Sequence, residues 1–320
     1  MAAQRRVPQL PSSSTNQSVV VWSGVLPARN ASKSAFSCKV FLGGVPWDIT
    51  EKDLMAAFRQ FGELRVEWPG IHDKSLKSNR MPKGHLYLIF EEEWSVKCLL
   101  GACTYDFHHG QHNWFYKVAS KRMLVKSVQV IPWQLADAVY TQPGYDPKHV
   151  ANMGAGKIFV ANLHGMITAE GLAKITNEMF GGVIAATLDT DKTKYPIGSG
   201  RVTFGNHESH MMAIRAGMID IRTAKFSRQI KIDPYLEDSK CSLCNCDLGE
   251  FFCRNLMCFR YFCDRCWTWQ HGSGEFRDHQ WMRRPPRATT SYSSAAEFCP
   301  SSGISSGADD LDSLLSSMSL

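Results

Sequence analysis

The sequence has no long hydrophobic run. None of its windows reaches the roughly 18 consecutive apolar residues that a membrane-spanning helix requires. Its first residues also lack the basic stretch followed by an apolar segment that marks a signal peptide. We therefore expect a soluble protein that is not secreted and has no membrane partner.

The motifs of common enzymes are also missing. The sequence contains no glycine-rich phosphate-binding loop and no Ser, His and Asp set in a pattern that indicates nucleophilic catalysis. It also has little excess charge, because 36 basic residues face 30 acidic ones in 320 residues. We expect no catalytic residues, and the net charge of +6 permits a polyanionic partner without indicating one.

Periodicity is missing at both ends of the chain. Residues 1–36 are rich in Ser, Asn, Pro and Ala, and residues 285–306 have a similar Ser- and Pro-rich character, without the regular spacing of apolar residues that packed helices or strands show. Residues 309–320 alternate acidic, Ser and Leu or Met positions, for which a short docking segment is the alternative to an unstructured tail. Such segments bury too little apolar surface to offset the loss of chain entropy. We predict that residues 1–36 and 285–320 are disordered.

Between these ends, one pattern occurs twice. The apolar strand predicted at residues 39–45 returns at 157–163, with Phe41 and Phe159 at the same place in each. A Thr at a helix-capping position follows each strand, Thr50 and Thr168. Further apolar segments complete the order strand, helix, strand, strand, helix, strand in both copies, with insertions at 74–81 and 103–122 in the first. The run at 114–118 predicts a hairpin added to the first sheet.

The third strand of the first copy carries the strongest local signal. Residues 83–90 fit the signature of an RNA-recognition motif, with some of its aromatic positions replaced. Alternation places Lys83, His85 and Tyr87 on the open sheet face beside Phe41. Unstacked bases can lie on such rings for about 1–3 kcal/mol each, and Lys83 can meet phosphate. The alternatives are that Phe41 and Tyr87 belong to the core and that His85 is merely solvated.

The second copy has fewer rings at these positions. Only Phe159 remains, with Arg201 able to stack by its guanidinium plane or to pair with phosphate. Gln129 and Lys231 are candidate contacts to base edges, whereas Trp68 and Trp133 either cover a base or pack against the fold. The predicted RNA-contacting residues are Phe41, Lys83, His85, Tyr87, Gln129, Phe159, Arg201, Lys231, Trp68 and Trp133.

These patterns predict an α+β fold. We expect two tandem ferredoxin-like βαββαβ RNA-recognition motifs at residues 37–133 and 157–235, joined by a linker, 134–156, that orders on binding. A small cross-braced two-zinc domain is expected at 236–284.

Cysteines crowd into that last region, where 7 of the 11 in the chain fall between Cys241 and Cys266. In a reducing compartment this crowding indicates metal binding. Interleaved pairing assigns Cys241, Cys244, Cys263 and Cys266 to one zinc ion, and Cys253, Cys258, His271 and His279 to the other. Four protein ligands leave no open position for water, so we expect two structural Zn²⁺ ions. Cys246 is the competing ligand, and ordinary buried thiols are the alternative.

Several stretches resemble the cytoplasmic polyadenylation element-binding protein family. They include residues 40–50, 66–69, 128–133, 195–204 and 232–238, and the zinc region resembles the ZZ-type domain of that family. The resemblance implies binding to U-rich cytoplasmic polyadenylation elements in mRNA 3′ untranslated regions. It also implies control of poly(A) tail length and translation.

Two other functions remain open at this point. The chain could be a nuclear RNA-processing or single-stranded-DNA-binding factor, or a scaffold that binds protein through its zinc domain. We expect a cytoplasmic protein, with the nucleus as a further compartment, whose partners are U-rich mRNA and polyadenylation or translation-control proteins.

Overall fold

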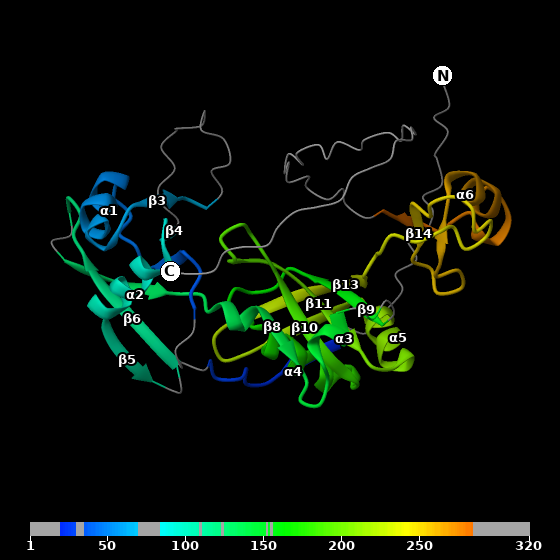
Figure 1. Cartoon of the computed structure of the whole chain (residues 1–320), viewed down its shortest axis with the longest axis horizontal. Helices are drawn as coiled ribbons and strands as arrows, with labels where there is room; N and C mark the ends of the chain where they lie inside the picture. The colour runs from blue at the N-terminus through cyan, green and yellow to red at the C-terminus, as the bar shows by residue number, and fades with distance from the viewer. Residues whose placement is uncertain are drawn as a thin grey trace, which may run out of the picture.

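The computed structural model describes residues 20–29, 35–69, 84–108, 111–122, 125–151, 153 and 156–283. Three bodies follow one another along the longest axis in Figure 1, with β4, β9 and β14 marking each in turn. Within the described residues, no helix combines the length and apolarity needed to cross a membrane. The predictions for residues 1–19, 74–81 and 285–320 lie outside the described residues, as does the one for Lys83.

The first body has the predicted βαββαβ order. Its sheet runs β3-β4-β2-β7-β6-β5, and the last two strands are the inserted hairpin, as the run at 114–118 predicted. The elements are β2 (Lys39–Gly43), α1 (Glu51–Phe58), η1 (Arg59–Phe61), β3 (Leu64–Glu67), β4 (His85–Phe90), α2 (Glu93–Ala102), β5 (Thr104–His108), β6 (Gln111–Val118) and β7 (Lys126–Ile131).

Local chemistry explains why α1 begins where it does. The Thr50 hydroxyl accepts a hydrogen bond from the Asp53 backbone N–H, and the Asp53 carboxylate accepts one from the Thr50 backbone N–H. This capping box satisfies two N–H groups that the first turn would otherwise leave unpaired. Leu54 and Phe58 then point into the core, where both side chains are fully buried. The helix therefore covers one face of the sheet and leaves the other open.

The second body repeats the order and enlarges it. Its central strands run β13-β9-β11-β10, with β12 and β1 added beyond β13 and β8 added beyond β10. The elements are β9 (Lys157–Ala161), α4 (Ala169–Phe180), β10 (Val183–Thr190), β11 (Pro196–Phe204), α5 (His207–Ala216), β12 (Met218–Arg222) and β13 (Ser227–Pro234).

The strand β1 (Val20–Ser23) corrects the prediction that residues 1–36 are disordered. It pairs in parallel with β12, with Val20 opposite Ile219. Trp22 is 3% exposed inside the second core, and its indole N–H donates to Glu178 at 2.6 Å. The prediction is therefore wrong for residues 20–29, which precede the first motif in sequence yet pack on the second.

The linker prediction needs a similar correction. Residues 134–156 were expected to order only on binding, but they contain η2 (Leu135–Ala138), β8 (Val139–Thr141) and α3 (Pro147–Ala151). β8 pairs with β10, and Val150 packs against Ile184. The described residues of the linker are thus part of the second body.

Replacing Trp22 by alanine is expected to lower the free energy of unfolding by about 3–5 kcal/mol, the usual cost of removing a buried Trp. Chemical denaturation checks this loss. Val21→Ala is the matched control, because Val21 is its neighbour on β1 but 41% exposed. Equal, small effects of the two substitutions would contradict the packing of β1 on the second motif.

The third body is small and has little hydrophobic core. It consists of β14 (Phe251–Cys253), β15 (Tyr261–Phe262), α6 (Asp264–His271), η3 (Gly274–Phe276) and β16 (Trp281–Met282). It docks on the second body through Arg254, whose guanidinium lies 3.2 Å from the Asp233 carboxylate and donates to the Ile232 carbonyl at 3.0 Å. Phe259 packs against the second core.

Candidate nucleic-acid interface and metal centre

Three rings lie together on the open face of the first sheet. Phe41 and Tyr87 are opposite each other on β2 and β4, with ring centroids 5.6 Å apart. The Phe41 and His85 rings are stacked at 5.4 Å. The alternating residues Leu42 and Leu86 are fully buried on the other face. Phe41 and Tyr87 are therefore not core residues of this motif, and they form a platform on which bases could stack.

Gln129 and Trp68 lie at the edges of this platform. Gln129 is on β7 opposite Gly43, and its amide N–H donates to the Asn113 side-chain oxygen at 3.2 Å. Trp68 packs partly against the first core and also lines the cleft between the motifs. Its position is therefore compatible with both alternatives that the sequence left open.

The second sheet has its basic groups already paired. The Arg201 guanidinium lies 3.0 Å from the Asp189 carboxylate and 5.5 Å from the centre of the Tyr235 ring. The Lys231 ammonium lies 2.8 Å from the Asp233 carboxylate. Phe159 is half-buried between these groups, opposite Arg201 in the strand register. This sheet therefore presents less unpaired positive charge than the sequence suggested.

Trp133 is not available to cover a base. Its side chain is 1% exposed in the second core. Of the two alternatives, covering a base or packing against the fold, the structure therefore shows packing. The Arg29 guanidinium lies 5.2 Å from its ring centre and 3.6 Å from the Asp137 carboxylate. Burial lowers the pKa of Arg29, and the neighbouring Asp137 opposes this shift. Assigning Trp133 an RNA contact from sequence was thus wrong for this arrangement.

A cleft of about 1010 Å³ separates the two sheets. The first motif contributes Phe41, Tyr87 and Gln129 to its walls, and the second contributes His164 and Tyr195. Leu26, Pro27 and Arg29 of the N-terminal segment also line it. The cleft thus brings two rings of the platform and the second motif around a single volume.

Contacts between the two motifs form part of the lining of the cleft. The Lys39 ammonium lies 2.7 Å from Glu67 of its own motif and 3.4 Å from Asp191 of the second. It also lies 4.6 Å from the centre of the Tyr87 ring, whose centroid is 5.5 Å from that of Tyr195. We name Lys39, Tyr87, Asp191 and Tyr195 the interdomain latch. Sequence reasoning missed it, because strand periodicity does not reveal which residues of two motifs meet.

The charge of Asp191 persists at neutral pH. Burial alone would raise the pKa of this carboxyl, but hydrogen bonds from the Thr193 side chain and from the Tyr195 and Thr193 backbone N–H groups outweigh it, and Lys39 adds to them. The net result is a lowered pKa. A lowered value in the folded state means that the contribution of Asp191 is present above the ordinary pKa and is lost as the pH falls through the lowered one. Asp191 therefore keeps its charge across the physiological range.

Replacing Lys39 by methionine is expected to weaken the contact between the motifs by about 1–2 kcal/mol, since it removes a charge-assisted bond between the buried Lys39 and the partly exposed Asp191. Nuclear magnetic relaxation should then report different tumbling times for the two motifs. Lys97→Met is the control, because the ion pair of Lys97 with Glu93 lies within α2. Common tumbling of both motifs in Lys39→Met would count against the latch.

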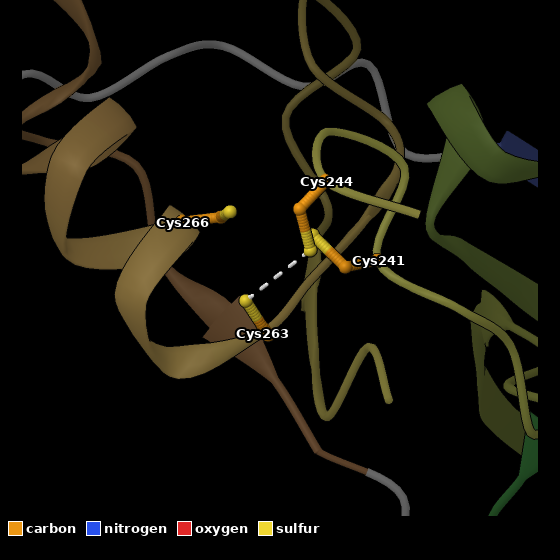
Figure 2. Close-up of side chains that lie close together, drawn as sticks. All are labelled: Cys241, Cys244, Cys263 and Cys266. Carbon is orange, nitrogen blue, oxygen red and sulfur yellow. Dashed lines mark hydrogen bonds between the residues drawn. The ribbon is translucent and has the colours of Figure 1, made fainter. Parts of the chain in front are cut away.

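Four thiols converge in the third body. Figure 2 shows Cys241 and Cys244 from one loop facing Cys263 and Cys266 at the start of α6. Their sulfur atoms all lie within 4.8 Å of one another, and the Cys244 and Cys263 sulfurs are 3.9 Å apart. A tetrahedral zinc ion with bonds of about 2.3 Å needs sulfurs about 3.8 Å apart. The cluster therefore has the size and the donor set that zinc prefers.

A second cluster has two thiols and two imidazoles. The Cys258 sulfur lies 3.6 Å from His271 Nε2 and 3.4 Å from His279 Nδ1, and the Cys253 sulfur lies 3.6 Å from His279 Nδ1. The Trp267 ring stacks on His271 at 3.7 Å and holds its orientation. The structure thus groups the ligands as the interleaved spacing predicted. Cys246, the competing ligand, is exposed and belongs to neither cluster.

These features define a class. Two βαββαβ sheets with one open face each, followed by a module with two thiol-rich clusters, make this a tandem RNA-recognition-motif protein with a zinc-binding module. A family model for the RNA recognition motif matches residues 37–132, and one for the cytoplasmic polyadenylation element-binding protein ZZ domain matches residues 228–285. The chain belongs to the cytoplasmic polyadenylation element-binding protein family, which is an RNA-binding family and not a family of enzymes.

Two curated relatives show how far the similarity extends. Cytoplasmic polyadenylation element-binding protein 1 of Danio rerio is 46% identical over 279 residues, which cover 85% of this chain and 49% of the relative. Cytoplasmic polyadenylation element-binding protein 3 of Caenorhabditis japonica is 39% identical over 312 residues, 89% of this chain and 41% of the relative. The chain therefore spans about half the length of the curated relatives it matches, or less.

Among solved structures, the RNA-binding domain of Hrp1 in complex with RNA is similar at 22% sequence identity and a TM-score of 0.23. The match covers 63% of this chain and 98% of that one. We draw no conclusion about this chain from a similarity at this TM-score. The strand order of the two sheets defines the fold.

Proposed function

We propose that the chain binds single-stranded U-rich cytoplasmic polyadenylation elements in mRNA 3′ untranslated regions and thereby regulates poly(A) tail length and translation. The observation that carries the proposal is the cleft, because two rings of the platform, Phe41 and Tyr87, line one continuous volume together with the second motif. Base stacking on such rings is the usual way in which these sheets hold single strands. We take the cytoplasmic polyadenylation element as the target because the curated relatives are named as proteins that bind it.

Two Zn²⁺ ions are part of this proposal, one in each ligand cluster. Cys241, Cys244, Cys263 and Cys266 would hold the first, and Cys253, Cys258, His271 and His279 the second. Four donors around each ion fill a tetrahedral shell, so zinc would stabilise the module and would not activate water. The role of the ions is therefore to hold a module that has few buried side chains of its own.

The zinc module also offers a surface for protein partners of the polyadenylation or translation machinery. Several large apolar side chains remain exposed on it, including Trp269 at 73% and Met257 at 81%. Exposed apolar groups of this size favour contact with another protein. The crowded thiols require a reducing compartment, and we place the protein in the cytoplasm, with the nucleus as a further compartment. Imaging of the tagged chain in cells tests this placement.

Competition binding at a fixed salt concentration tests the RNA proposal, since salt changes all phosphate contacts together. We expect a U-rich RNA with one internal A to bind at least about tenfold more tightly than a C-rich RNA or the DNA analogue. Preference for the DNA would favour a single-stranded-DNA-binding factor. Equal, weak binding of all three would favour a scaffold acting through its zinc module.

A further inference from the structure

The inserted hairpin brings a second amide to the platform. Asn113 is on β6, two residues from Phe115, which lies opposite Gln129 of β7. Side chains two residues apart on a strand share a face, so Asn113 and Gln129 both belong to the open face. They are joined by the 3.2 Å hydrogen bond from the Gln129 amide, and both line the cleft with Phe41. The hairpin therefore extends the platform with polar groups.

Gly43 leaves space between the platform ring and this amide pair. A Cβ atom at position 43 would lie 3.1 Å from the Phe41 ring and 3.9 Å from the side chain of Gln129. Because glycine has no such atom, the ring and the amide border one shallow slot on the sheet. A base that stacks on Phe41 consequently has its edge within reach of Gln129.

The amide pair retains unused hydrogen-bonding capacity. One bond between the two side chains leaves the Gln129 carbonyl oxygen as an acceptor and the Asn113 NH₂ as a donor. The edge of uracil presents acceptor, donor and acceptor in sequence, so it meets a donor beside an acceptor in either order. The edge of cytosine presents one donor followed by two acceptors and fits only one of the two orders. Only the order in which the donor meets O4 and the acceptor meets N3–H excludes cytosine, so the pair selects uracil when Asn113 faces O4 and Gln129 faces N3–H.

We propose that Gln129 and Asn113 together hydrogen-bond the edge of a uracil that stacks on Phe41. The inserted β5–β6 hairpin thereby supplies a base-selective contact that a four-stranded motif lacks. This inference rests on the proposed function, since it assigns one nucleotide of the bound RNA to a named site.

The test measures discrimination and not affinity alone. The full chain is titrated with a U-rich RNA and with a set in which each uridine in turn is replaced by cytidine. At one position, Asn113→Ala and Gln129→Ala are each expected to reduce the preference for uridine by about tenfold, the effect of one lost hydrogen bond. The double variant should lose little more, because the two amides act as a pair. Ser127→Ala is the matched control, since Ser127 is exposed on the same face of β7 and does not line the cleft.

A modified RNA tests the same contact from the side of the base. Uridine methylated at N3 cannot donate, so at the same position it should weaken binding to the unaltered protein by about tenfold and leave binding to Gln129→Ala unchanged. Unchanged discrimination by Asn113→Ala at every position, with U-rich RNA still bound tightly, would overturn this inference alone. Failure of the unaltered protein to prefer U-rich RNA would overturn the proposed function as well.

Discussion

Replacing Phe41 and Tyr87 together by alanine is expected to lower the affinity for U-rich RNA by about 100-fold. Each base stacked on an aromatic ring contributes about 1–3 kcal/mol, and the two rings occupy the centre of the platform. The stacking contribution of Tyr87 is expected near the lower limit of this range, because Lys39 and Tyr195 already contact its ring. Titration of a fluorescently labelled RNA, at one stated salt concentration, measures the change.

The control for this prediction removes an aromatic ring from the opposite face. Trp94 is 68% exposed on α2, away from the open side of the sheet. Trp94→Ala should therefore bind RNA as tightly as the unaltered chain. A similar loss in both variants would mean that general destabilisation, and not base stacking, explains the effect.

Replacing Cys253 by serine is expected to unfold the zinc module. Cys253 is fully buried, and few other side chains form a core around it. Structural zinc sites contribute an apparent free energy of about 10–16 kcal/mol to small modules of this kind, so the loss of one ligand removes most of what holds the fold. Metal analysis should show zinc falling from two ions per chain to at most one. Near-ultraviolet circular dichroism should lose the signal of the tryptophans beside the ligands.

The neighbouring cysteine provides a matched control for the zinc prediction. Cys246 is exposed and outside both clusters. Cys246→Ser should consequently retain two zinc ions and an unchanged spectrum. Retention of two ions by Cys253→Ser, or loss of one by Cys246→Ser, would contradict the ligand assignment.

The two sheets differ in what they offer to RNA. The first presents three rings, whereas the second presents Phe159 beside basic groups that already pair with Asp189 and Asp233. Breaking such pairs to bind phosphate would cost part of the energy gained. We therefore assign base stacking mainly to the first motif, with the second motif and the N-terminal segment forming the opposite wall of the cleft.

Local patterns were enough to predict much of this fold. The capping Thr50, the alternation around Tyr87 and the run at 114–118 each depend on neighbours in sequence, and the structure shows each as expected. The spacing of the cysteines likewise limits how two tetrahedral sites can form, and the eight side chains group accordingly.

Contacts between distant segments could not be predicted in the same way. The valines before Trp22 indicate a strand, but nothing near them indicates that its partner is β12, about 200 residues later. Trp133 has the large aromatic side chain of a stacking residue. Its burial becomes visible only when the packing of the second core is known. Tyr195 and Asn113 were missed because each becomes part of the cleft only after two separately folded elements meet.

The proposed function depends most on one RNA strand lying in the cleft between the two motifs. Photo-crosslinking of the full chain to U-rich RNA containing 4-thiouridine, followed by mass spectrometry of the peptides, tests this directly. We predict that one complex carries crosslinks in the β2 and β4 peptides around Phe41 and Tyr87 and in the second-motif peptides around His164 and Tyr195. Crosslinks confined to the zinc module, or to the helical faces of the motifs, would contradict it.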